Sequence, residues 1–227
     1  MILAVNTSTT QFSIALAGMK GDVLAECLIS PGEKNFQSFM PAVYSMFDAC
    51  SRDIKELKVV AVASGPGSFT GLRVGLSMAK GVAQGLGIPI IGVSSLEALA
   101  SQVPFIKHPL CTLMSSRRGE VIFAVFKWDE AKGLTRLTED RSVTFNDLAG
   151  FIKGPTCFIG NNFIVQEPMV KEMIGVNAFI APSHLWNLRA SSVGALGLRR
   201  FSANDLDNIT DLVPEYLRPP DIRANPF

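Results

Sequence analysis

A glycine-rich stretch at residues 64–75 contains the residue types that most directly suggest chemistry; it reads SGPGSFTGLRVG. It lies between an apolar run typical of a buried strand and a segment with helical spacing. Backbone N–H groups of such a turn, at the start of a helix, can hold a phosphate or another anion. One hypothesis is therefore an anion-binding site formed by Gly65, Gly67, Ser68, Thr70, Arg117 and Arg118.

The two best-defined phosphate motifs do not match this stretch. The P-loop pattern fails in every register because no lysine follows the glycines, and a dinucleotide pattern starting at Gly65 has Thr70 where the third glycine belongs. We favour a simpler interpretation, a tight turn in which Ser68 or Thr70 caps the following helix. Arg117 and Arg118 would then be solvated side chains at a hairpin tip.

Serine and histidine residues give little support to a peptidase. The two histidines, His108 and His184, form no metal-binding pair with helical spacing. Ser94 follows an expected strand but lacks the second glycine of a nucleophile elbow. It stands three residues before Glu97, which is the spacing of a helix capping box. We therefore expect neither catalytic nor metal-binding residues.

The helix expected at residues 71–86 has an unusually wide apolar surface. Its polar side chains, Arg73, Ser77, Lys80 and Gln84, fall in one stripe of roughly 60°. Small residues every fourth position form a flat strip: Gly71, Gly75, Ala79 and Ala83. Two explanations remain open. The helix is wedged between two lobes of its own chain, or it is a protein–protein interface with Arg73 and Lys80 at the rim.

Elements of the first half follow from hydrophobic spacing. Three strands at residues 2–5, 12–17 and 23–29 predict an antiparallel meander. A helix at 35–49 places Phe36, Phe39, Met40, Val43, Tyr44 and Phe47 on its buried face. A buried strand at 59–63, the long helix ending near Gly87, and a strand at 88–93 predict a right-handed parallel crossover.

The second half repeats this plan, with strands at 110–113, 120–126, 134–143 and 156–159 and a helix opening at 144–146. This order predicts an α/β protein with the two-lobed acetate kinase, sugar kinase and actin-like (ribonuclease H-like) fold, each lobe a mixed sheet with helices. We expect an N-terminal lobe at 1–105, with the glycine-rich turn and interface helix. The C-terminal lobe would cover 106–227, its last segment packing back on the first lobe.

Composition is consistent with this plan. The chain has 227 residues, 48% of them hydrophobic, and a net charge of +1. We recognise no signal peptide and no apolar run of about 18 residues, so we expect a cytoplasmic protein. The four cysteines stand far apart and are expected to be reduced. The balanced charge shows no footprint for nucleic acid.

The chain resembles the TsaB family, formerly called YeaZ or glycoprotease-like. The resemblance is carried by the block GPGSFTGLR at residues 65–73, by Gly81 and Ala83, by SSL at 94–96, by RRGEV at 117–121 and by PEYLR at 214–218. It therefore spans nearly the whole chain. The sequence departs from the family at three places. It has Asn6 where the family commonly has Asp, and Gln37-Ser38 where the family has His-Ser. It has Ser115-Ser116 where the family has Asp-Ala. Asn6 is a weaker magnesium ligand than aspartate.

The resemblance implies a non-catalytic subunit of the bacterial machinery for tRNA N6-threonylcarbamoyladenosine. Such a subunit supports the catalytic TsaD by heterodimerisation, with the ATPase TsaE in a ternary complex, and forms a homodimer when alone. ATP and magnesium are expected on the partner subunits, tRNA contact is indirect, and no membrane is involved. The expected partner interface comprises Phe69, Gly71, Leu72, Arg73, Gly75, Leu76, Ala79, Lys80, Val82 and Ala83. The alternatives are a nucleotide-dependent enzyme of the sugar kinase superfamily and, least favoured, a peptidase.

Overall fold

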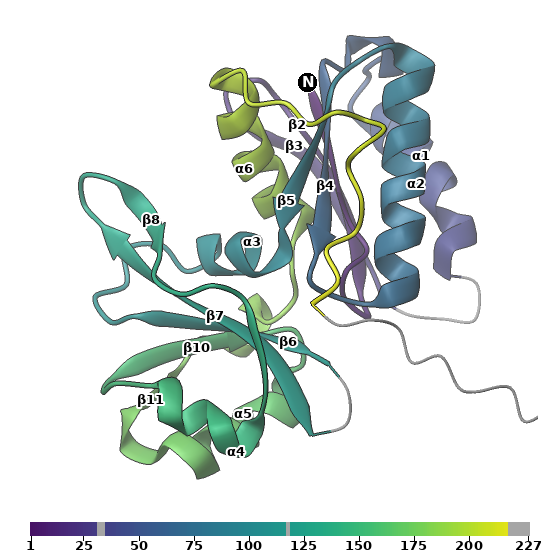
Figure 1. Ribbon diagram of the computed structural model, residues 1–227. Helices are drawn as coiled ribbons and strands as arrows, with labels where there is room; N and C mark the ends of the chain where they lie inside the picture. Colours follow the sequence, from purple (N-terminus) through teal and green to yellow (C-terminus); the bar gives the residue numbers. More distant parts are fainter. Residues whose placement is uncertain (31–34, 117–118, 218–227) are drawn as a thin grey trace, which may run out of the picture.

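Two sheets organise the chain, one in each lobe (Figure 1), in a computed structural model that describes residues 1–30, 35–116 and 119–217. The first sheet has the order β3 (Val23–Ile29), β2 (Phe12–Ala17), β1 (Ile2–Asn6), β4 (Val59–Gly65), β5 (Ile90–Ser94). The first three strands form the predicted antiparallel meander, and β4 and β5 run parallel to β1. Every residue of β1 and β4 is buried, as their continuous apolar runs require.

Helices cover both faces of the first sheet. Alternate residues of β1 contribute to two different cores, because successive side chains point to opposite faces. Leu3 and Val5 pack with residues of α1 (Phe39–Ala49) and α2 (Phe69–Leu86), whereas Ile2 and Ala4 pack with α3 (Ser95–Ser101) and α6 (Ala190–Ser202). The first lobe is therefore a helix–sheet–helix sandwich.

The second sheet has the order β11 (Ala178–Ile180), β10 (Thr156–Gly160), β6 (Leu110–Ser115), β7 (Glu120–Asp129), β8 (Gly133–Arg136), and β9 (Arg141–Thr144) also pairs with β7. The helices α4 (Phe145–Leu148) and α5 (Phe163–Ile174) pack on one face. Helix α3 contacts β4 of the first sheet and β6 of the second, so it lies between the lobes. Short 3-10 helices occupy Asn35–Ser38, Ile54–Glu56, Ala149–Phe151, Gly175–Asn177 and Ser183–Leu185.

Two predicted boundaries need correction, and a third is confirmed. The helix expected from residue 35 begins as a 3-10 turn and becomes α-helical only at Phe39. The single strand expected at 134–143 is two strands, β8 and β9. Their pairing with β7 is interrupted because the Thr138 hydroxyl accepts the hydrogen bond of the Val125 N–H at 2.9 Å. The long helix ends where predicted, with Gly87 as a left-handed C-cap.

The chain returns to the first lobe after its second sheet is complete. Helix α6 lies on β1, β2 and β4, and residues 203–217 then run along the edge strand β5 and beside α2 (Figure 1). The side chain of Asp207 accepts a hydrogen bond from the Gly92 N–H at 2.7 Å. Both ends of the described chain therefore belong to the same lobe.

None of the helices in the described ranges is long and apolar enough to cross a membrane. The four cysteines are free thiols. Cys111 and Cys157 are buried, and burial raises the pKa of Cys157 to about 11. Both behave as apolar core residues, whereas Cys27 and Cys50 are half-buried.

Candidate functional site

The glycine-rich turn connects β4 to α2, as predicted, and Ser68 caps the helix. Its side-chain oxygen accepts a hydrogen bond from the Gly71 N–H at 3.2 Å. Its own N–H donates to the carbonyl of Ser8 at 2.7 Å. Of the two residues considered as caps, Ser68 therefore has this role, and the turn is tied to the loop that follows β1.

The chain itself occupies the space beside the turn. A Cβ atom on Gly71 would lie 2.0 Å from the carbonyl oxygen of Thr7, and one on Gly75 would lie 1.9 Å from the Thr7 hydroxyl. The Thr7 hydroxyl donates to the carbonyl of Gly71 at 2.7 Å. Gly65 has a φ of +138°, and a Cβ there would lie 2.6 Å from the carbonyl oxygen of Glu215. The small residues of the turn are thus explained by close contacts within the chain.

Asn6, at the end of β1, is fully buried and completes the same loop. Its side-chain N–H group donates to the carbonyl of Leu188 at 2.9 Å and to the Thr9 hydroxyl at 3.2 Å. Its side-chain oxygen accepts from the N–H of Ser8 at 3.0 Å and from the Ser8 hydroxyl at 2.7 Å. The amide therefore acts as donor and acceptor together, which an ionised carboxylate cannot do.

Most of the residues expected at a partner interface are internal. The buried ones are Gly71, Leu72, Gly75, Leu76, Ala79 and Ala83. The small-residue strip consequently faces Thr7 and the sheet core, and an incoming backbone has no access to it. Phe69, Lys80 and Val82 are half-buried and Arg73 is exposed. Arg117 and Arg118, expected in an anion site, lie outside the described residues.

Arg73, expected at the rim of an interface, is held by the chain's own C-terminal segment. Its guanidinium carbon lies 3.8 Å from the centre of the Phe69 ring, and its Nε donates to the Tyr216 hydroxyl at 2.8 Å. The rings of Phe69 and Tyr216 are 4.9 Å apart. This stack fixes the position of the guanidinium and covers one flank of α2.

The face of α2 that points away from the sheet is exposed to solvent, with Arg73 at its edge, and α1 has an exposed face as well. These two helices lie on the same face of the first sheet (Figure 1). The exposed residues of α2 are Thr70, Arg73, Ser77, Gly81, Gln84 and Gly85, and those of α1 are Pro41, Tyr44, Ser45, Asp48 and Ala49. Tyr44 is 55% exposed, so its predicted place on the buried face is wrong. It supplies a large ring among small neighbours.

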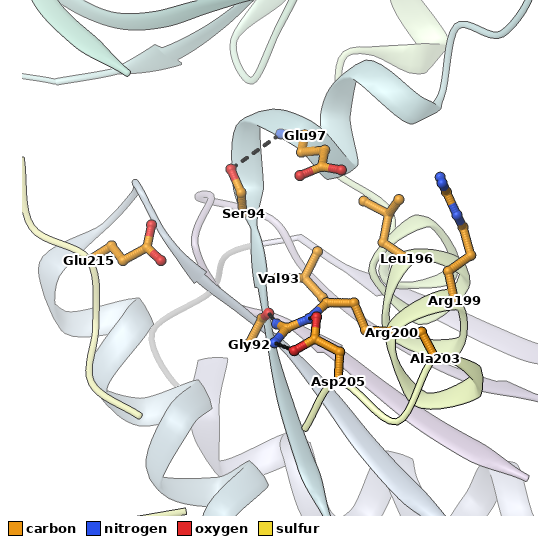
Figure 2. Close-up of a pocket in the computed structure, with 10 residues that line it drawn as sticks. All are labelled: Gly92, Val93, Ser94, Glu97, Leu196, Arg199, Arg200, Ala203, Asp205 and Glu215. Carbon is orange, nitrogen blue, oxygen red and sulfur yellow. Dashed lines mark hydrogen bonds and ion pairs between the residues drawn. The ribbon is translucent and has the colours of Figure 1, made fainter. Parts of the chain in front are cut away.

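A hollow of about 490 Å³ lies at the carboxyl end of β5 (Figure 2). It is lined by β5, α3, α6 and the C-terminal segment. Ser94, weighed from the sequence as a nucleophile, faces this hollow, and its hydroxyl oxygen accepts from the Glu97 N–H at 3.4 Å. It also accepts from Arg136 Nη2 at 3.1 Å. The predicted capping role of Ser94 is confirmed, and its hydroxyl also links the lobes.

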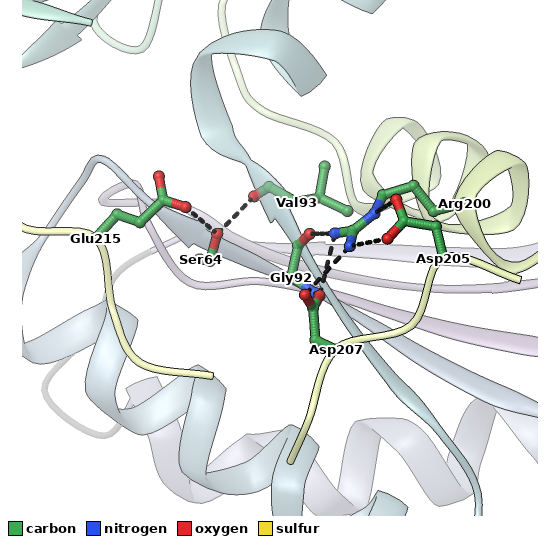
Figure 3. A network of polar contacts seen from close by, with 7 residues as sticks. All are labelled: Ser64, Gly92, Val93, Arg200, Asp205, Asp207 and Glu215. Atoms are coloured by element: carbon green, nitrogen blue, oxygen red, sulfur yellow. Dashed lines mark hydrogen bonds and ion pairs between the residues drawn. The ribbon is translucent and has the colours of Figure 1, made fainter. Parts of the chain in front are cut away.

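Polar groups near this hollow anchor the C-terminal segment (Figure 3). Arg200 donates to the carbonyl of Gly92 at 2.6 Å and to the carboxylates of Asp205 and Asp207, at 2.7 and 3.1 Å. The hydrogen bond to Asp205 is the main cause that raises the pKa of Arg200 above its ordinary value. Burial, reinforced by Asp140, raises the pKa of Glu215, which lies 3.5 Å from the Ser64 hydroxyl.

Comparisons with known proteins agree with the resemblance seen in the sequence. The family model of TsaD, tRNA N6-adenosine threonylcarbamoyltransferase, matches residues 33–181. The Bacillus subtilis tRNA threonylcarbamoyladenosine biosynthesis protein TsaB is 32% identical over 96% of this chain and 93% of its own length. The Escherichia coli TsaB protein is 35% identical over 57% of this chain and 56% of its length.

A solved structure confirms the predicted two-lobed fold. It is described as an uncharacterized protein with similarity to peptidase YeaZ from Pseudomonas aeruginosa. It is 21% identical in sequence, with a TM-score of 0.79 over 96% of this chain and 99% of that one. Together with the near full-length sequence match, these findings show that the chain belongs to the TsaB family.

Proposed function

We propose that this protein is a non-catalytic subunit in the biosynthesis of tRNA N6-threonylcarbamoyladenosine, where it supports the catalytic TsaD subunit by heterodimerisation. The near full-length match to a protein named for this pathway carries the proposal. In this role the protein is cytoplasmic, forms a homodimer when alone, and joins TsaE in a ternary complex. ATP and magnesium bind to the partner subunits, and tRNA contact is indirect.

The contacts of the glycine-rich turn favour a scaffold over a nucleotide-dependent enzyme. Nucleotide phosphates need free backbone N–H groups and a carboxylate-held metal near such a turn. In this chain the Thr7 and Ser8 backbone fills the space beside Gly71 and Gly67, and the Ser68 N–H already has an acceptor. The side-chain N–H group of Asn6 is directed at the Leu188 carbonyl.

The outer face of α1 and α2 is the surface that we assign to the partner. Gly81 and Gly85 leave it flat, with no atom within 4 Å of a Cβ added at either position. Tyr44 is an exposed ring of the type that often anchors an interface. This assignment replaces the buried residues of α2 with its outward-facing ones and keeps Arg73 at the edge.

Substitutions on this face test the proposal without disturbing the core. Gly81→Arg places a long side chain in the middle of the face and should not destabilise the helix, because arginine has the higher helix propensity. Gly150→Arg is a matched control, since Gly150 is an exposed glycine in the second lobe with equally open surroundings. Sizing-column light scattering with the TsaD protein of the same organism measures the assembly.

We expect wild type and Gly150→Arg to be homodimers that convert to heterodimers, and folded Gly81→Arg to do neither. A heterodimer formed equally well by Gly81→Arg would remove α2 from the interface. A wild-type chain that ignores TsaD would contradict the proposed role. Tight magnesium–ATP binding by the isolated chain would instead favour the enzyme alternative.

A further inference from the structure

Phe105, in the turn between α3 and β6, is an exposed aromatic residue in an unfavourable backbone conformation. Its side chain is 88% exposed, and its φ is +60°. A bulky residue in the left-handed region is strained, and such strain is concentrated at functional sites. Because the ring is exposed, burial of apolar surface offsets little of this strain. Burial within this chain therefore does not account for Phe105.

Phe105 forms one wall of a hollow in the second lobe. Its ring centre lies 5.3 Å from that of Trp128, with 35° between the ring planes. The hollow has a volume of about 350 Å³ and is bordered by the β7–β8 turn and by Lys107. It belongs to the second lobe, because β7 and β8 are strands of the second sheet, whereas α1 and α2 cover the first sheet.

The charged side chains that line the hollow determine which kind of ligand it can bind. The lining includes two carboxylates, those of Asp129 and Glu130, and one ammonium group, that of Lys107. Asp129 Oδ1 accepts hydrogen bonds from the N–H groups of Ala131 and Lys132, both at 2.9 Å. The bond from Lys132 is the largest cause that lowers the pKa of Asp129, and the bond from Ala131 is the next. Both favour the ionised carboxylate. Lys127 also acts on Asp129, but carboxylates outnumber the ammonium group among the lining residues, so a cation is attracted there.

We propose that this hollow binds an arginine side chain of a partner protein. A guanidinium group is planar and weakly hydrated, so it can stack on an aromatic face while its edge donates to carboxylates. Phe105 provides the exposed face, Trp128 supports that ring, and Glu130 accepts from the guanidinium edge. This site is independent of the α1–α2 face.

Nuclear magnetic resonance of the full-length protein can detect such a contact even when it is weak. Of the two indole N–H groups, that of Trp186 is buried and donates to Ala181 at 2.9 Å. That of Trp128 has no hydrogen-bond partner among the described residues. The probe is the capped tripeptide Gly-Arg-Gly. The matched control is the same peptide with citrulline, which is planar but uncharged.

We expect the arginine peptide to shift the Trp128 indole resonance with a dissociation constant of about 1–10 mM, as suits one cation–π contact. The citrulline peptide should bind roughly tenfold more weakly. Glu130→Gln should weaken arginine binding roughly two- to fivefold. Phe105→Gly should abolish it while leaving the melting temperature unchanged or raising it by about 2 °C, because strain is relieved.

Ser51→Gly is the control for backbone relief, since Ser51 has a φ of 52° at a position outside the hollow. It should leave peptide binding unchanged. Equal shifts with the arginine and citrulline peptides would overturn the proposal, as would binding that survives in Phe105→Gly. A shift produced by a uridine hexanucleotide and not by the peptide would also overturn it, and would assign the hollow to nucleic acid.

Discussion

Asn6 joins the end of β1 to the segment that leads into α6. Replacing its amide group with a carboxylate should lower the stability of the folded protein. The side chain donates to the Leu188 carbonyl and accepts from Ser8, so both halves of the amide are used. The Ser8 N–H can only donate, which fixes the orientation of the amide. Aspartate, the residue that the family commonly has, would direct an oxygen at the Leu188 carbonyl.

Asn6→Asp should therefore lower the free energy of unfolding by about 2–4 kcal/mol at pH 7. Burial would raise the folded-state pKa of the new carboxyl above its unfolded value of about 3.9. Stability is then retained below that value, where the acid is protonated and can donate, and is lost as the pH rises through the folded-state pKa. Urea denaturation at pH 4 and pH 7 measures the difference.

Asn208→Asp is the matched control for this substitution. Asn208 is exposed, and its side-chain oxygen accepts from the Thr210 N–H at 2.8 Å, a bond that a carboxylate can also accept. It should show little change at either pH. If Asn6→Asp were as stable as wild type at pH 7, the hydrogen bond to Leu188 would not be a determinant of stability.

Helix α2 shows how far the sequence could be interpreted. The narrow polar stripe correctly indicated a helix with wide burial, and the capping residues Ser68 and Gly87 marked its ends. The strip of small residues was ambiguous, because close approach by Thr7 of the same chain and by a partner's backbone need the same spacing. A large residue at Gly75 would thus test packing against Thr7 and would not report on partner binding.

Tyr44 and the β8–β9 break were missed for different physical reasons. Tyr44 has a spacing compatible with the core, but α1 lies at the margin of the lobe and buries only Phe39, Val43, Met46 and Phe47. Periodicity gives the direction of a side chain without telling where the covering layer ends. The strand break depends on one Thr138 hydroxyl bond, for which the sequence has no distinctive pattern.

The folded protein, including the contact of its C-terminal segment with the first lobe, should be more stable when Glu215 is uncharged. Burial and the nearby Asp140 raise the pKa of this carboxyl above its ordinary value. The stability that depends on it is present below its unfolded pKa of about 4.3 and is lost as the pH rises through the folded-state pKa. Glu215→Gln should therefore raise the melting temperature by roughly 1–3 °C at pH 8 and change it little at pH 4. An equal effect at both pH values would exclude this titration as the cause.

Each lobe is completed by a helix from the other half of the sequence. The first lobe needs α6, which follows residue 105, and the second lobe needs α3, which precedes it. Helix α6 covers the first sheet so closely that a Cβ on Gly197 would lie 2.5 Å from that of Ala61. Arg189, just before α6, donates to Glu26 of β3 at 2.9 Å. Helix α3 in turn packs on β6 and β7 of the second sheet.

Dividing the chain at the exposed turn around Phe105 should therefore abolish folding of both pieces. Residues 1–105 lack α6 and would expose the apolar face of the first sheet, while residues 106–227 lack α3 and would expose Leu110 and Phe126 of the second. Each fragment alone should show no cooperative thermal transition by circular dichroism. Mixing the fragments should restore one, because the cut breaks a surface turn and leaves every core contact available. A cooperative transition in the isolated 106–227 fragment would show that the second lobe is stable without α3.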